Sequence, residues 1–429
     1  MLGMNRKLAQ LEKEGGMIRV GLIGAGQMGR GMISQIESMR GMRVVATADL
    51  LVDNAVKAYT LAGVPESNIV RTDDRDLADK KIAGGFVVVT RDADMIAHLD
   101  GVDVIVDATG IPNVGAQVAW NAIMNKKHIV MLNVETDVTV GPLLKRLADA
   151  AGVVYTGSAG DEPGAIMELY DFAEAIGFDI IAVGKGKNNQ LNVLSNPDVT
   201  AELARKIGAS PKMLASFQDG TKTMVEMTAV ANATGFVPDV PGMHGVKAKV
   251  ENLPDLFQLR EKGGILHRTR VVDYVDGVAP GVFAVITSDK LEVHHEMKYL
   301  KMGNGPHYVL FRPYHLTSLE TPLSIARAYF YREPTIAPYF GTVAETVTVA
   351  KKTLQPGEAL DGIGGFTVYG KIMTAKDQKE HNALPIGLVG PNVRMRRTVE
   401  QGQLVTYDDV EFAESNFIMY LRELMQMGD

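Results

Sequence analysis

The residue run 184–189 reads Gly-Lys-Gly-Lys-Asn-Asn at the end of an expected β-strand, and it is the strongest candidate for chemistry in the chain. Because side chains alternate along a strand, Lys185 and Lys187 share one face while the two glycines share the other. Two neighbouring ammonium groups can polarise a substrate oxygen, and their proximity lowers the pKa of one of the two lysines, which favours proton transfer. We therefore predict Lys185 and Lys187 as catalytic groups, with Asn188 and Asn189 binding the substrate. The alternative is a surface strand with two solvated lysines.

Two adjacent carboxylates, Asp161 and Glu162, stand directly before Pro163 and an expected helix. Either carboxylate can transfer a proton or bind a divalent metal ion, and either can instead cap the helix. We predict both as catalytic residues and leave a divalent metal open as a cofactor. Lys222 and Glu226, one helical turn apart, are expected to form no more than an ion pair along a helix.

A second group of polar residues follows the strand expected at residues 308–312. Arg312 suits a bidentate grip on a phosphate or carboxylate, and His315 suits proton transfer. With Ser158, which follows an earlier strand, we predict both as ligands of an anionic small-molecule substrate. The alternative for Arg312 and His315 is a purely structural pairing.

A glycine-rich loop lies directly behind the first apolar run of the chain. It follows the pattern GxGxxG, with Gly24, Gly26 and Gly29 at the fixed positions and Gln27 and Met28 between them. In a strand-loop-helix context these glycines form a tight turn, admit a pyrophosphate and let the helix pack closely on the strand. We predict that these five residues bind a dinucleotide; the alternative is an ordinary glycine-rich turn.

Asp49 ends the next apolar run and lies twenty residues after Gly29. A carboxylate at this place accepts hydrogen bonds from the ribose hydroxyls and repels a 2′-phosphate. The next basic residue is Lys57. The cofactor is therefore NAD or NADP, with Asp49 favouring NAD. The alternative is that Asp49 only caps the following helix.

Later strand ends carry further candidate cofactor ligands. Thr109 and Gly110 follow the strand expected at residues 102–107, and Asn133 and Glu135 follow the one at residues 128–132. Ligands of parallel sheets bind at these carboxyl ends, so we predict that all four residues contact the cofactor. We expect a polar loop here, with the next helix beginning at Gly141.

Composition and charge restrict the class of protein. The chain has 429 residues, a net charge of −7 and no cysteine. The negative charge argues against binding to nucleic acid, and the lack of cysteine excludes disulfides and thiolate catalysis. No apolar run approaches the length of a membrane span, so we expect a cytoplasmic protein that binds no membrane.

The order of expected elements indicates an α/β protein with several domains. We expect an N-terminal helix over residues 1–16 and a Rossmann dinucleotide-binding domain over residues 17–164. A catalytic and dimerisation domain of the α+β class follows over residues 165–335, with strands at 179–187, 271–275, 282–287 and 308–312. A small β-rich module closes the chain over residues 342–429. We expect a homo-oligomer.

The chain also resembles the homoserine-dehydrogenase-like oxidoreductases that carry a C-terminal SAF domain. Among these it is most similar to the 1-deoxy-D-xylulose-5-phosphate reductoisomerase-like family. The resemblance covers nearly the whole chain, and it rests on residues 23–26 with 28–29, 107–112, 160–163, 184–189, 222–227, 243–245 and 312–320.

The resemblance implies a Rossmann domain, a homoserine-dehydrogenase-like catalytic domain and a SAF module, assembled as a dimer. It implies rearrangement of a deoxyketose phosphate followed by reduction with NADPH. Asp49 departs from the basic residues that suit NADPH in that family, and Val134 departs from the Asn-Lys pair of true homoserine dehydrogenases. We therefore expect an NAD(P)-dependent oxidoreductase acting on a small polyol, sugar phosphate or sugar acid. The alternatives are a homoserine dehydrogenase and an NAD-bound sensor without catalysis.

Overall fold

The computed structural model describes residues 3–428 and divides into two compact units. Residues 1–2, part of the expected N-terminal helix, and residue 429 lie outside the described residues. The first unit runs to Asp161 and includes Leu316–Ala337 and the segment from Asn416 onward. The second unit comprises Glu162–His315 and Pro338–Ser415.

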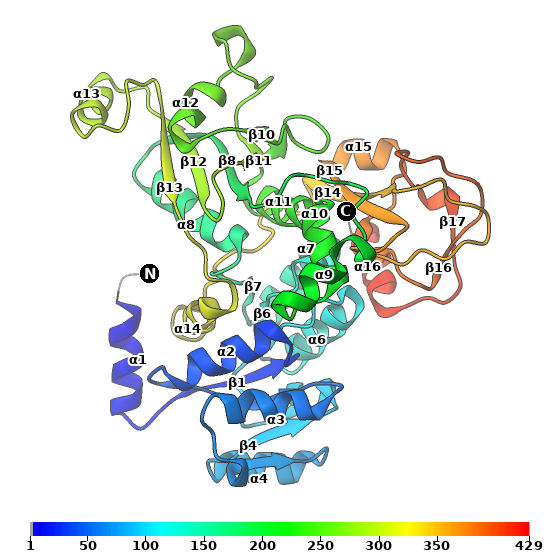
Figure 1. The fold of residues 1–429 in the computed structure, drawn as a ribbon. Helices are drawn as coiled ribbons and strands as arrows, with labels where there is room; N and C mark the ends of the chain where they lie inside the picture. The colour runs from blue at the N-terminus through cyan, green and yellow to red at the C-terminus, as the bar shows by residue number, and fades with distance from the viewer. Residues whose placement is uncertain (1–2, 429) are drawn as a thin grey trace. The chain divides into compact units, whose positions relative to one another are not determined.

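Seven parallel strands form the sheet of the first unit, in the order β3-β4-β2-β1-β5-β6-β7 (Figure 1). The strands are β1 (Ile18–Ile23), β2 (Met42–Ala48), β3 (Ile69–Arg71), β4 (Val87–Thr90), β5 (Val104–Asp107), β6 (His128–Met131) and β7 (Tyr155–Gly157). The order reverses between β1 and β5, as in doubly wound dinucleotide-binding folds, where ligands bind at that reversal. The predicted α/β class with a Rossmann-like sheet is confirmed.

Helices connect and cover these strands. They are α1 (Met4–Lys13), α2 (Gln27–Glu37), α3 (Val52–Leu61), α4 (Arg75–Ala83), α5 (Ala93–His98), α6 (Pro112–Met124), α7 (Val134–Ala151), α14 (Thr321–Tyr331) and α16 (Phe417–Met427). The strands are buried almost throughout, because helices connecting parallel strands shield both faces of the sheet from water.

Two of these helices come from distant parts of the chain. α14 buries Ile325 and Ala326 in the same core as the parallel strands. α16 packs on α6 and α7, with the rings of Phe417 and Trp120 edge to face at 5.8 Å. The domain limits expected from the sequence place α14 in the catalytic domain and α16 in the β-rich module. In the structure both helices belong to the first unit, on which their apolar faces pack.

Helix α7 begins earlier than expected from the sequence. It starts at Val134 instead of Gly141, because Asn133 caps it: the Oδ1 atom accepts a hydrogen bond from the Thr136 amide at 3.2 Å. An asparagine in this position satisfies an amide that the first helical turn leaves unpaired. The prediction of a polar loop over residues 133–137 is therefore wrong: Asn133 caps a helix, and residues 134–137 form its first turn.

The second unit contains a mixed sheet in the order β10-β11-β8-β12-β13, with β9 added on β11. The strands are β8 (Asp179–Lys187), β9 (Val237–Pro238), β10 (Val246–Lys247), β11 (Val271–Asp276), β12 (Val282–Thr287) and β13 (His307–Arg312). β8 lies in the middle, parallel to β11 and antiparallel to β12. Both lysines of this strand, Lys185 and Lys187, are buried.

Helices α8 (Glu162–Ala175) and α11 (Thr221–Thr234) pack on this sheet (Figure 1). An apolar core that includes Leu253, Phe257 and Phe283 also forms against the strands. The remaining helices of this stretch are α9 (Pro197–Ile207), α10 (Pro211–Gln218), α12 (Leu253–Leu256) and α13 (Leu291–Tyr299).

The C-terminal part of the second unit is made of short strands. An antiparallel pair joins β14 (Ala344–Ala350) to β15 (Val368–Thr374), and a second joins β16 (Val393–Met395) to β17 (Val410–Phe412). Helix α15 (Ala375–Glu380) follows β15 directly. The first pair packs against α11, where the hydroxyls of Thr228 and Thr346 lie 2.8 Å apart.

Candidate active site

Lys185 lies at the centre of a buried cluster of charges. Its side chain is 8% exposed, and its ammonium group donates hydrogen bonds to the carboxylates of Glu162 and Glu226. Glu162 is the first residue of α8, and Glu226 projects from α11. The two helices packed on the sheet thus bring both carboxylates to a lysine of the central strand.

Burial and ion pairing act in opposite directions on this cluster. Burial lowers the pKa of Lys185, but Glu162 and Glu226 outweigh it and raise that pKa above its ordinary value. Burial and the neighbouring Glu162 raise the pKa of Glu226, while Lys185 opposes this. Lys185 is therefore a permanently charged ammonium group that cannot act as a base near neutral pH.

Lys187 shares the strand with Lys185, but its surroundings are different. Its ammonium group donates to the backbone carbonyl of Phe217 and to Oδ1 of Asn189, both at 2.5 Å. Burial, followed by repulsion from Lys185, lowers the pKa of Lys187 to about 8. Lys187 is thus the group of this pair that can exchange a proton at physiological pH.

The two glycines that alternate with the lysines, Gly184 and Gly186, are required by packing on the opposite face of β8. A Cβ atom on Gly184 would lie 2.1 Å from the carbonyl oxygen of Asp273, and one on Gly186 would lie 2.2 Å from the amide nitrogen of Ala279. No side chain fits at such distances. The alternating Gly-Lys pattern therefore reflects one face that touches backbone and one that carries the charges.

His315 and Arg312 lie at two different places along α8. His315 Nε2 is 3.4 Å from Glu162 Oε1, so the structure joins His315 to the Lys185 cluster. Arg312 Nη1 pairs instead with Glu168 Oε2 at 3.0 Å. Of the two predicted substrate ligands, His315 thus lies beside a predicted catalytic carboxylate and Arg312 lies further along the helix.

The other predicted residues are distributed as follows. Asn189 contacts Lys187, whereas Asn188 is exposed to solvent. Asp161 is buried and is the last residue of the first unit. Ser158 is buried in that unit, with its hydroxyl 2.8 Å from that of Thr321.

Glu226 is the member of the cluster that sequence reasoning missed. Its spacing from Lys222 predicted a pair along one helix, and nothing in the spacing indicates a contact with Lys185, 41 positions away. Glu162 and Glu226 each also offer a carboxylate oxygen that could bind a metal ion. Both use an oxygen to hold the Lys185 ammonium.

The glycine-rich loop has the geometry of a dinucleotide site. Gly24 has a φ of 98°, which favours glycine, and a Cβ on Gly29 would lie 2.0 Å from the Gly24 carbonyl oxygen. At Gly26, by contrast, no described atom lies within 4 Å of an added Cβ, so the backbone is open to a ligand. Gln27 and Met28 begin α2, whose first amides and dipole favour a phosphate group.

Asp49 fastens this loop to the end of β2. Its Oδ2 atom accepts a hydrogen bond from the Ala25 amide and its Oδ1 atom one from the Leu51 amide, both at 2.8 Å. Helix α3 has Leu51, not Asp49, as its N-cap residue. Asp49 therefore orders the loop, and the remaining lone pairs of its carboxylate can accept ribose hydroxyls.

Thr109 and Asn133 belong to one network around the buried carboxylate of Asp107. Asp107 Oδ1 accepts from the Thr109 hydroxyl at 2.7 Å, and Oδ2 accepts from Asn133 Nδ2 at 3.0 Å. Burial raises the pKa of Asp107. Gly110 follows with a φ of 65°, and Glu135 is buried in the first turn of α7. The network fixes the carboxyl ends of β5 and β6.

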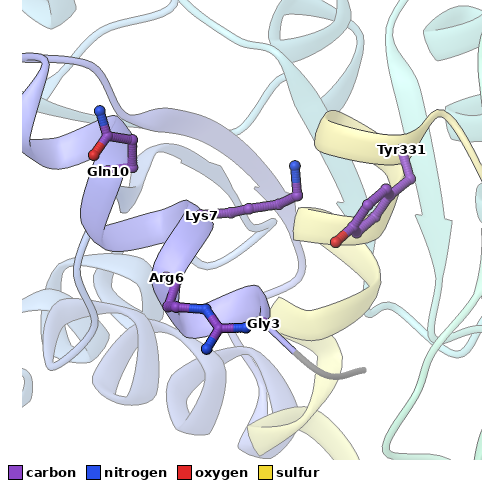
Figure 2. A pocket seen from close by; sticks show the side chains of 5 residues that line it. All are labelled: Gly3, Arg6, Lys7, Gln10 and Tyr331. Carbon is purple, nitrogen blue, oxygen red and sulfur yellow. The ribbon is translucent and has the colours of Figure 1, made fainter.

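A cavity of about 430 Å³ lies elsewhere on the first unit, between α1 and α14 (Figure 2). Its lining residues are Gly3, Arg6, Lys7, Gln10 and Tyr331. The Lys7 ammonium lies 4.9 Å from the centre of the Tyr331 ring. None of these residues is a predicted site residue.

No helix within residues 3–428 has the length and apolar character needed to span a membrane.

Two protein-family models match the chain. Residues 24–156 match a homoserine dehydrogenase NAD-binding domain, and residues 160–321 match an oxidoreductase DRL catalytic domain. No curated protein sequence matches. The two matched stretches contain the glycine-rich loop and the lysine cluster, respectively.

Solved structures with some similarity include two dehydrogenases and a reductase. A probable dehydrogenase from Thermotoga maritima is 11% identical over 76% of this chain and 92% of that chain, with a TM-score of 0.44. A putative myo-inositol dehydrogenase from Sinorhizobium meliloti 1021 is 13% identical over 70% of each chain, with a TM-score of 0.34. Biliverdin reductase from Synechocystis sp. PCC 6803, in complex with biliverdin and NADP+, is 16% identical over 41% of this chain and 48% of that chain, with a TM-score of 0.28.

The doubly wound sheet, the open glycine loop at its carboxyl edge and the two matched domain models agree with one another. The protein is an NAD(P)-dependent oxidoreductase.

Proposed function

We propose that the protein is an NAD-dependent dehydrogenase acting on a small anionic polyol, sugar phosphate or sugar acid, with Lys187 as the acid/base group. The buried lysine pair carries this proposal, because Lys185 stays charged whereas the pKa of Lys187 is lowered to about 8. A nicotinamide bound at the glycine-rich loop would supply the hydride chemistry of the reaction. Lys187 takes the hydroxyl proton when the alcohol is oxidised and returns it when the carbonyl is reduced. Lys185 is the fixed cation that polarises the same oxygen.

The pH dependence of turnover tests the role of Lys187. Alcohol oxidation needs the neutral amine, so we expect its kcat to rise through about pH 8, while kcat for carbonyl reduction falls through the same range. Lys187→Met should abolish this change of kcat around pH 8, which we call the limb of the pH profile, and should lower kcat. The measurement is kcat against pH in both directions; a limb of the same shape in Lys187→Met would contradict the assignment.

The anionic end of the substrate is assigned to Asn188, Arg312 and His315. Arg312 is paired with Glu168, whose side chain is 52% exposed. An ion pair with so exposed a partner contributes little to stability, so a phosphate or carboxylate can take the place of Glu168. A deoxyketose phosphate, the substrate class implied by the resemblance, is the first compound to test. Fosmidomycin-sensitive, NADPH-dependent turnover would establish the reductoisomerase reaction.

Asp49 is proposed to select NAD over NADP. Asp49→Asn keeps an acceptor for the Ala25 amide but removes the charge that repels a 2′-phosphate. We expect the ratio of the NADPH and NADH dissociation constants to fall about tenfold, equivalent to about 1.4 kcal/mol. Fluorescence titration with both cofactors measures this ratio. An unchanged ratio would mean that Asp49 only orders the loop.

A further inference from the structure

Lys351, which follows β14, is a buried lysine outside the predicted site. Its side chain is 3% exposed, and its ammonium group lies 2.7 Å from Oδ2 of the fully buried Asp219. It also donates to the carbonyl oxygens of Ser195 at 2.5 Å and Gly365 at 2.7 Å. One ammonium group therefore joins three stretches of the second unit that are far apart in sequence.

Asp219 connects this ammonium group to the carbonyl that holds Lys187. It is the C-cap of α10, and its carboxylate also accepts a hydrogen bond from the Thr221 amide at 2.8 Å. The carbonyl oxygen of Phe217, two residues before Asp219, accepts a hydrogen bond from the Lys187 ammonium at 2.5 Å. A fixed Asp219 therefore fixes the direction of the Phe217 carbonyl.

Ser195 connects the same ammonium group to the segment that follows Lys187. The Ser195 hydroxyl donates to Gln218 Oε1 at 2.7 Å, and the Asn192 amide donates to the Gln218 carbonyl at 2.8 Å. This segment begins directly after Lys187 and includes Asn189, the second acceptor of the Lys187 ammonium. The two acceptors of Lys187, Phe217 and Asn189, thus belong to two chain segments that the Lys351–Asp219 pair holds together.

We propose that the Lys351–Asp219 ion pair is a positioning device for Lys187, which fixes the Phe217 carbonyl and the Asn189 segment around its ammonium group. Neither member of the pair is assigned a contact with substrate. The inference rests on the proposed function, since the ion pair affects catalysis only if Lys187 transfers the proton.

The charged groups facing Lys187 determine the direction of the expected effect. Burial and Lys185 lower the pKa of Lys187, whereas Glu226, Asp219 and Asp276 raise it. Removing the Asp219 carboxylate takes away one of the groups that favour the charged lysine, and releasing the Phe217 carbonyl takes away a hydrogen bond to it. Both changes lower the pKa of Lys187 further.

The experiment measures the pKa of Lys187 directly, by NMR of protein labelled with ¹³C at lysine Cε. The Lys187 signal is assigned by its absence from Lys187→Arg. In Asp219→Asn we expect the pKa of Lys187 to fall by about 0.5 to 1 unit, and the limb of the kcat profile to move with it. Lys352→Met is the matched control, because the neighbouring Lys352 is half exposed and pairs with Glu358. Lys352→Met should leave the pKa of Lys187 and the position of the kcat limb unchanged.

A second variant covers the case in which a single substitution prevents folding. Lys351→Met combined with Asp219→Leu removes both buried charges together, a replacement that proteins often tolerate. The pKa of Lys187 should fall here as well. An unchanged pKa of Lys187 in both folded variants would overturn the inference. A fall in that pKa without any movement of the kcat limb would support the positioning role and contradict the proposed function.

Discussion

Lys185→Met is expected to lower kcat by about a hundredfold or more while leaving the affinity for the nicotinamide cofactor unchanged. Methionine has nearly the length of lysine but no charge, so the substrate oxygen loses its fixed cation. The cofactor loop lies in the first unit and does not depend on this residue. Steady-state kinetics and an NADH titration of the same preparation measure the two effects. Equal losses of kcat and of cofactor affinity would point to general misfolding.

The same variant has an expected signature in its stability. Without Lys185, the carboxylates of Glu162 and the buried Glu226 lose the ammonium group that they share, and breaking such a buried ion pair costs about 3–5 kcal/mol. The pKa of Glu226 is already raised by burial and should rise further. A protonated Glu226 is favoured in the folded state, so the variant should be most stable at acid pH and lose stability as the pH rises through that pKa. Lys206→Met, which breaks an exposed pair with Glu202, should show neither effect.

Gly26→Ala is expected to weaken cofactor binding alone, whereas Gly29→Ala is expected to lower folding stability as well. In Gly29→Ala the added Cβ meets the Gly24 carbonyl at 2.0 Å, so both folding stability and cofactor binding should fall. In Gly26→Ala no described atom opposes the new methyl group within 4 Å, and the residue has an ordinary φ of −66°. Its melting temperature should therefore match that of the wild type, but the methyl group occupies the approach of the pyrophosphate. We expect cofactor affinity to fall at least about tenfold.

Thermal unfolding together with NADH titration separates these variants. A Gly26→Ala protein that binds NADH as tightly as the wild type would show that the pyrophosphate does not approach the backbone there. A stable Gly29→Ala protein would mean that α2 moves away from β1 at little cost. Either result would contradict the geometry assigned to the loop.

The first unit could be predicted from local patterns in the sequence. Apolar runs followed by small residues mark parallel strands, and GxGxxG marks their first turn, because both depend on a few consecutive residues. The start of α7 was missed because Gly141 and Pro142 are poor residues for a helix interior, yet they lie inside a continuous helix that begins at Val134. The placement of α14 and α16 was missed because it depends on contacts with distant elements.

The two lysines of the candidate site could be predicted from the sequence, but their contacts with other elements could not. Alternation along a strand places Lys185 and Lys187 on one face whatever lies opposite. Glu226 contacts Lys185 from 41 residues later in the chain, and the Phe217 carbonyl contacts Lys187 from 30 residues later; no spacing rule predicts such contacts. The difference between the two lysines, one held charged and one with a lowered pKa, exists only in the folded chain.

The most direct test of the proposal is turnover by Lys187→Met at saturating cofactor, measured on the anionic hydroxy compound that the wild type oxidises fastest. Nicotinamide absorbance reports the rate, and an NADH titration of the same sample confirms an occupied cofactor site. We predict a loss of turnover of about a hundredfold or more with unchanged NADH affinity. Turnover at the wild-type rate, with the same dependence on pH, would contradict the assignment of Lys187 as the acid/base group.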